Sequence, residues 1–97
     1  MNDYKNFVKD LTELIEFKST EGEKENGAPF GREVKNALRF FLSLAEKFGF
    51  ETINYEDYAG EIIFGKKGLP EIGIIGHLDV VPAGGGWDTD PFALTLK

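Results

Sequence analysis

The sequence predicts an α/β fold in which two helices are followed by the strands of a mixed sheet. Apolar residues recur at spacings of three and four over residues 4–15 and again over 34–48, a period typical of helices with one buried face. After Gly49 the period shortens, and the stretch 71–76 continues from Ile72 without a polar residue. Such a run is typical of a strand that is covered on both faces. Two helices followed by strands indicate the beginning of a helix-covered sheet.

Turn-forming residues separate these elements. Residues 19–31 are polar and rich in Glu, Gly and Asn, so we expect a loop between the two helices. Lys47 and Gly49 favour a helix end at this point. A basic side chain suits the last turn of a helix, and glycine readily adopts the left-handed backbone that stops one.

Short strands are expected over residues 50–53 and 61–65, on either side of a turn at 57–60. A further turn at 66–70 precedes the buried strand. Residues 92–97 begin the pattern of another strand. Because no repeat or linker interrupts the chain, we expect one domain, and the unfinished strand favours a truncated one.

Composition narrows the class of protein. The 97 residues are 41% hydrophobic and 29% charged, which is ordinary for a globular chain, and the net charge is −6. An acidic surface repels phosphate, so neither nucleic acid nor an anionic membrane is an expected partner. The chain has no cysteine, no signal-like beginning and no apolar run long enough to span a bilayer. We therefore expect a soluble, cytoplasmic protein.

The chain's single histidine follows the predicted buried strand. His77 and Asp79 are two positions apart, so in extended backbone both side chains project to the same side. A neutral imidazole can bind a metal through one nitrogen while its other N–H donates to a carboxylate, which fixes the tautomer. A His-x-Asp pair is by itself more often a surface or capping pair. The surrounding residues decide between these readings.

The residues around this pair resemble a known family. Gly-His-Leu-Asp-Val-Val-Pro-Ala-Gly at 76–84 and Gly-Trp-Asp-Thr-Asp-Pro-Phe at 86–92 are similar to the first metal-ligand motif of the co-catalytic zinc peptidase superfamily. That superfamily includes carboxypeptidases, deacetylases, desuccinylases and dipeptidases. The second stretch, with the upstream residues 49–50 and 58–62, most resembles the PepV-type, carnosinase-like Xaa-His dipeptidases. The resemblance covers most of residues 30–92.

This resemblance implies that residues 1–97 are the N-terminal portion of a single zinc-peptidase catalytic domain. It implies that His77 binds one of two zinc ions and that Asp79 is the active-site acid that orients the imidazole. The family's other ligands and its general-base glutamate have no counterpart in this sequence, so we expect the isolated chain to be inactive. Gly85 departs from the family, in which an acidic residue commonly stands between the two glycines.

The function implied by the resemblance is that of a dinuclear zinc-dependent dipeptidase that hydrolyses short unprotected dipeptides. One alternative is an N-acyl-amino-acid deacylase or desuccinylase of the same superfamily. Another is a non-catalytic α/β interaction module that retains the motif. A small dipeptide is the expected partner, and the sequence does not indicate an oligomeric state.

Overall fold

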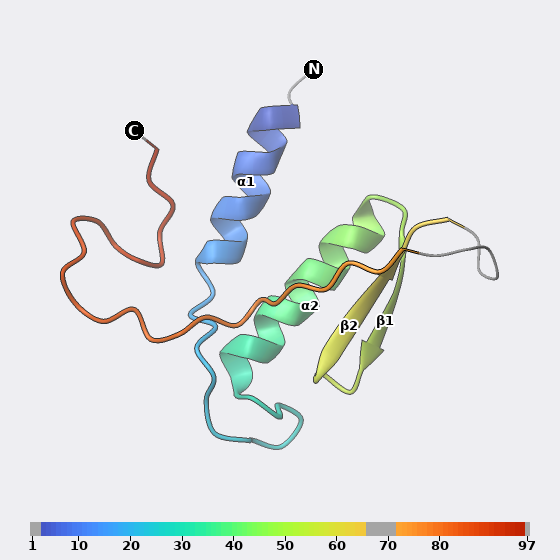
Figure 1. The fold of residues 1–97 in the computed structure, drawn as a ribbon, viewed down its shortest axis with the longest axis horizontal. Helices are drawn as coiled ribbons and strands as arrows, with labels where there is room; N and C mark the ends of the chain where they lie inside the picture. Colours follow the sequence, from blue (N-terminus) through green and yellow to red (C-terminus); the bar gives the residue numbers. More distant parts are fainter. Residues whose placement is uncertain (1–2, 66–71, 97) are drawn as a thin grey trace.

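The computed structural model describes residues 3–65 and 72–96, which form two helices and one β-hairpin (Figure 1). In chain order the elements are α1 (Asp3–Ile15), α2 (Arg32–Lys47), β1 (Glu51–Tyr55) and β2 (Ala59–Ile63). Both predicted helices and the loop between them are confirmed, and helices are combined with strands as an α/β chain requires. Neither helix of the described part is long and apolar enough to cross a membrane.

Helix α2 packs against both α1 and the hairpin. Three of the four buried hydrophobic residues of the described part belong to it, namely Ala37, Leu42 and Ala45. By contrast, α1 buries none of its residues. The helix ends at Lys47, and Gly49 follows with a φ of 92°, so the predicted helix end is confirmed. The structure thus has a small core, centred on one face of α2.

Strands β1 and β2 pair antiparallel, in a register that runs from Glu51 opposite Ile63 to Tyr55 opposite Ala59. The second strand therefore lies two residues earlier than the predicted 61–65 and shortens the connecting turn. One reason is the close packing of β2 on α2. A Cβ atom at Gly60 would lie 2.8 Å from Cδ2 of Leu42, so any larger residue would have to displace the leucine side chain. Residues that sequence reasoning assigned to the turn form the contact with the helix instead.

The hairpin turn is fixed to α2 by a buried carboxylate. Asp57 has a left-handed φ of 64° and is 8% exposed. Its two oxygens accept hydrogen bonds from Nε and Nη2 of Arg39, at 2.9 and 3.0 Å, and Oδ1 also accepts one from Nδ2 of Asn54 at 2.8 Å. These donors, Arg39 first and Asn54 second, lower the pKa of Asp57 to about 2. The turn therefore holds a charged group that α2 stabilises.

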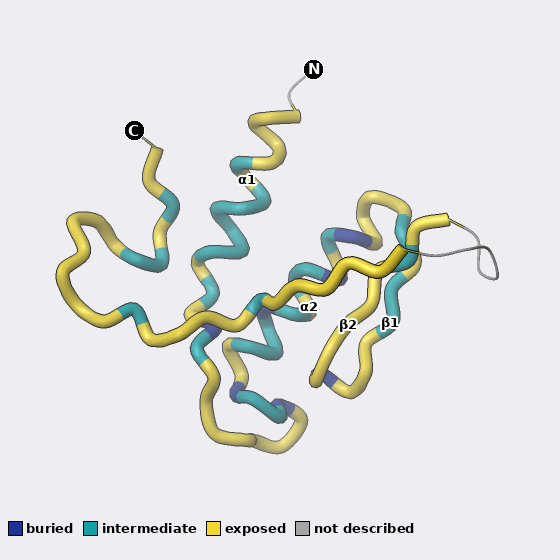
Figure 2. The backbone as a smooth tube through the Cα atoms, in the orientation of Figure 1, coloured by how far each residue is buried: buried dark blue, intermediate teal, exposed yellow. Residues whose placement is uncertain are grey.

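The prediction of a buried strand at 71–76 is wrong for residues 72–76, the part of this range that the structure describes. Residues 72–76 form no strand, and Ile72, Ile74 and Ile75 are 93%, 94% and 98% exposed (Figure 2). An apolar run becomes a buried strand only where neighbouring strands and helices cover it, and no described element packs over this segment. Likewise, residues 92–96 form no strand.

The described strands pair only with each other, so the mixed sheet stays a prediction. The predicted turn at 66–70, together with the first residue of the predicted strand, lies outside the described residues.

Candidate active site

The segment that carries the predicted site residues is attached to the chain just after α1. Thr20 and Val80 form an isolated parallel bridge, in which the amide of Val80 donates to the carbonyl oxygen of Ser19 at 3.0 Å. The hydroxyl of Ser19 donates to the carbonyl oxygen of Leu78 at 2.8 Å. These contacts join two segments about sixty residues apart in the sequence and hold the backbone on either side of Asp79.

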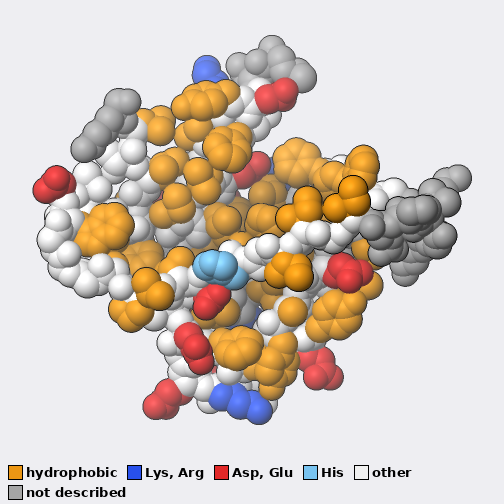
Figure 3. All heavy atoms as spheres, viewed as in Figure 1, with side chains coloured by type: hydrophobic (Ala, Val, Ile, Leu, Met, Phe, Trp, Pro, Cys, Tyr) orange, Lys and Arg blue, Asp and Glu red, His pale blue; other side chains and the backbone are white. Residues whose placement is uncertain are grey.

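The structure brings His77 and Asp79 together on one side of this segment. Nδ1 of His77 lies 3.4 Å from Oδ1 of Asp79 and 2.9 Å from its backbone carbonyl oxygen. Both side chains reach solvent, with exposed fractions of 80% for His77 and 55% for Asp79. Figure 3 shows the imidazole in pale blue at the molecular surface, next to an acidic side chain. The ring is therefore neither enclosed among apolar neighbours nor turned away from its carboxylate.

The backbone contact of the imidazole has a consequence for its tautomer. A carbonyl oxygen can only accept, so the 2.9 Å contact requires that Nδ1 of His77 carry the hydrogen. In the neutral ring the lone pair then lies on Nε2. The nitrogen that points away from Asp79 is consequently the one able to bind a metal, which is the arrangement usual for histidine ligands.

Zinc requires more donors than the described residues supply. Catalytic zinc commonly has three protein ligands, and the part of the chain that the structure describes contains no group of three His, Cys, Asp or Glu side chains able to hold a metal. His77 fits as one ligand by its chemistry and exposure. A complete site would need further side chains from outside residues 3–65 and 72–96.

The turn after the site is held by its own hydrogen bonds. Nε1 of Trp87 donates to the carbonyl oxygen of Ala83 at 2.9 Å, and Oδ1 of Asp90 accepts from the amide of Phe92 at 2.9 Å. Asp90 is therefore a turn residue in this structure. The ammonium of Lys18 lies 6.0 Å from the centre of the Phe92 ring, which brings this turn towards the end of α1.

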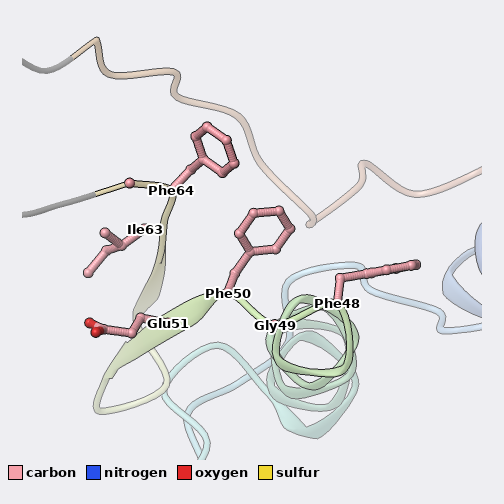
Figure 4. Close-up of a pocket in the computed structure, with 7 residues that line it drawn as sticks. Phe48, Gly49, Phe50, Glu51, Ile63 and Phe64 are labelled. Atoms are coloured by element: carbon pink, nitrogen blue, oxygen red, sulfur yellow. The ribbon is translucent and has the colours of Figure 1, made fainter.

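A separate hollow lies at the open end of the hairpin, away from His77. It is lined mainly by aromatic side chains, Phe48, Phe50 and Phe64, with Glu51 as its one acidic member (Figure 4). The rings of Phe50 and Phe64 are 5.7 Å apart. Since its lining offers a single ionisable side chain, this hollow lacks the paired groups that acid–base or metal chemistry needs.

Sequence reasoning did not identify Ser19 as part of the site. In the sequence it is the first residue of a polar loop, and nothing local marks a partner near position 78. The available indication was its position at the start of a loop, where small hydroxyl residues are common because they bond to nearby backbone groups. Only the folded chain shows that Ser19 is 4% exposed and bonded to the segment of His77.

Comparison with known proteins finds curated sequences similar to this chain. No family model matches the chain. Several curated proteins match it over nearly the whole length of this chain, among them proteins named dipeptidases. At 37–47% identity over 87 to 95 residues, the similarity is that of homologues. Over the matched residues the chain is therefore homologous to proteins named dipeptidases, the branch that its motif resembles.

The particular relatives are as follows. A "Beta-Ala-Xaa dipeptidase" from Lactobacillus delbrueckii subsp. lactis is 47% identical over 92 residues, which are 92% of this chain and 19% of that protein. "Putative dipeptidase YtjP" from Bacillus subtilis (strain 168) is 39% identical over 92 residues, covering 93% of this chain and 20% of the relative. The chain thus spans about a fifth of the length of the curated relatives it matches.

Proposed function

We propose that the protein containing this chain is a zinc-dependent dipeptidase in which His77 binds one of two metal ions. The observation that carries the proposal is the geometry of the imidazole. Its Nδ1 is occupied by Asp79 and its Nε2 is left for a ligand bond. The names of the homologous proteins support the same reaction class.

In this proposal His77 and Asp79 have different roles. His77 donates its Nε2 lone pair, and Asp79 holds Nδ1–H and stabilises the positive charge that the ring acquires on binding a cation. Bound zinc would polarise the scissile carbonyl and make a water molecule more acidic. The reaction adds one water across a peptide bond and releases a carboxylate and an amine.

The proposed substrates are short dipeptides with a free amino terminus. This class follows from the motif's resemblance and from the relative that is named for β-alanyl dipeptides. An N-acyl amino acid is the competing substrate, because the same chemistry cleaves its amide bond. The lack of cysteine supports a reducing compartment, so we place the enzyme in the cytoplasm.

A substrate panel tests the proposal. The complete protein from the full reading frame is freed of metal with a chelator, reloaded with zinc, and given β-alanyl-histidine, an α-dipeptide, an N-acetylated dipeptide and an N-succinyl amino acid. We expect cleavage of the first two substrates only. Cleavage confined to the acylated compounds would establish the deacylase, and no cleavage of any compound would refute a hydrolase.

The matched variants are His77→Ala and Thr12→Ala. Thr12 also bonds a backbone carbonyl, that of Val8, but it lies within α1 and outside the site. We expect His77→Ala to lower kcat by about 100-fold or more, which corresponds to about 2.7 kcal/mol, while Thr12→Ala retains the wild-type rate. Equal rates for both variants would remove His77 from the mechanism.

A further inference from the structure

Ser19 lies in the loop after α1 and is hydrogen-bonded to the segment that carries the candidate site. It is one of two buried polar residues in the described part of the chain, the other being Asp57 in the hairpin turn. Both of its oxygens are used on the segment that carries His77 and Asp79. The hydroxyl donates to Leu78, and the carbonyl accepts from Val80.

The geometry of a peptide group connects Ser19 with the imidazole. In a trans peptide the C=O and the N–H point in opposite directions, and the described residues contain no cis bond. The amide of Val80 points to Ser19, so the carbonyl of Asp79, in the same peptide group, points away from Ser19. That carbonyl is the one that lies 2.9 Å from Nδ1 of His77.

The hydroxyl of Ser19 holds the preceding peptide group. Its bond to the carbonyl of Leu78 fixes the plane on the amino side of Asp79, as the bond to Val80 fixes the plane on the carboxyl side. With both planes fixed, the Asp79 backbone cannot rotate its carbonyl away from the ring without breaking a hydrogen bond of the buried Ser19. Such a loss leaves an unsatisfied polar group and is unfavourable.

We propose that Ser19 is a positioning residue, which directs the backbone carbonyl of Asp79 at the imidazole and so keeps the Nε2 lone pair of His77 free for the metal. The metal-binding part of this inference rests on the proposed function. The tautomer part does not, because it concerns the metal-free protein. Asp79 thereby acts twice, through its carboxylate and through a carbonyl that Ser19 holds in place.

The first test measures the tautomer in the complete, metal-free protein. Nitrogen-15 NMR of the imidazole, at about pH 8 where a typical histidine is neutral, distinguishes Nδ1–H from Nε2–H, and the His77→Ala variant assigns the signals. We expect Nδ1–H in the wild type and a shift towards Nε2–H in Ser19→Ala. Identical spectra for the wild type and Ser19→Ala would overturn the proposal.

The second test measures zinc affinity by competition with a chelator. We expect Ser19→Ala to weaken zinc binding about tenfold, as the loss of an outer partner of a metal ligand commonly does, and Ser19→Thr, which keeps the hydroxyl, to restore it. Thr12→Ala controls for the loss of a hydroxyl elsewhere and should bind as the wild type does. Equal affinities for Ser19→Ala and Thr12→Ala would overturn the positioning role. A folded Ser19→Thr with the weakness of Ser19→Ala would do the same.

The two measurements separate this inference from the proposed function. If the wild-type protein binds no zinc, the proposed function fails, and the NMR comparison still decides what Ser19 does to the ring. If zinc binding depends on His77 but neither test responds to Ser19→Ala, the positioning role alone is refuted.

Discussion

Replacing Asp57 by Asn removes the charge of this side chain and one of its two acceptor oxygens. Asparagine has the same shape and tolerates the left-handed backbone of this position, where φ is 64°. The change therefore isolates the interaction of the carboxylate with Arg39 and Asn54. Its effect on the free energy of unfolding reports how strongly the turn is held to α2.

The size of the effect follows from the pKa of Asp57. Hydrogen bonds from Arg39 and then Asn54 lower it from 3.8 to about 2, and such a shift corresponds to about 2 kcal/mol at neutral pH. The Arg39 side chain is 57% exposed, so solvent screens part of this energy. We expect Asp57→Asn to destabilise the protein by about 1–2 kcal/mol at pH 7.

The pH dependence has a definite sign. Because the folded-state pKa lies below 3.8, the unfolded chain takes up the proton more readily than the folded chain. The contribution of Asp57 is thus complete above about pH 4 and is lost as the pH falls towards 2. The stability difference between the wild type and Asp57→Asn should shrink over this window.

Urea unfolding of the complete protein at pH 7 and at low pH measures this difference. Glu61→Gln is the matched control, because it removes an exposed carboxylate from the same hairpin and should change stability by less than about 0.5 kcal/mol. If Asp57→Asn is no more destabilising than the control, or if its effect does not depend on pH, the electrostatic reasoning is wrong.

Two further changes test packing and the site. Gly60→Ala places a Cβ within 2.8–2.9 Å of the Leu42 methyl groups, and we expect a loss of about 1 kcal/mol in thermal unfolding, since a leucine side chain can yield partly. Gly73→Ala meets no atom within 4 Å and serves as its control, so equal losses would refute the packing argument. Asp79→Asn keeps the backbone contact with His77 but loses the carboxylate charge. Its zinc affinity, measured by chelator competition, should fall about tenfold, and an unchanged affinity would assign the orienting role to the backbone alone.

The elements with a strong local signal were predictable from the sequence. The helical period over 4–15 and 34–48 and the glycine at 49 correspond to α1, α2 and the end of α2. The second strand begins two residues before its predicted start. Its bounds depend on the tertiary contact of Gly60 with Leu42, which the local sequence pattern does not contain. The apolar residues at 72–75 identify a segment that favours burial, but burial also requires a partner surface.

The candidate site, too, was predictable from the sequence only in part. The two-residue spacing of His77 and Asp79 predicted that their side chains share one side, and they do. The backbone contact to Nδ1 and the role of Ser19 depend on how two distant segments meet. The spacing of residues along the sequence does not show which distant segments come into contact.

The proposed metal site requires that Nε2 of His77 bind a metal ion. The most direct measurement is a crystal structure of the complete, zinc-loaded protein, with anomalous diffraction data collected at the zinc absorption edge. We predict a zinc peak about 2.0–2.1 Å from Nε2 of His77, with Nδ1 still facing Asp79. A fully loaded protein whose zinc peaks all lie away from this imidazole, or a peak on Nδ1, would show that Nε2 of His77 is not a metal ligand.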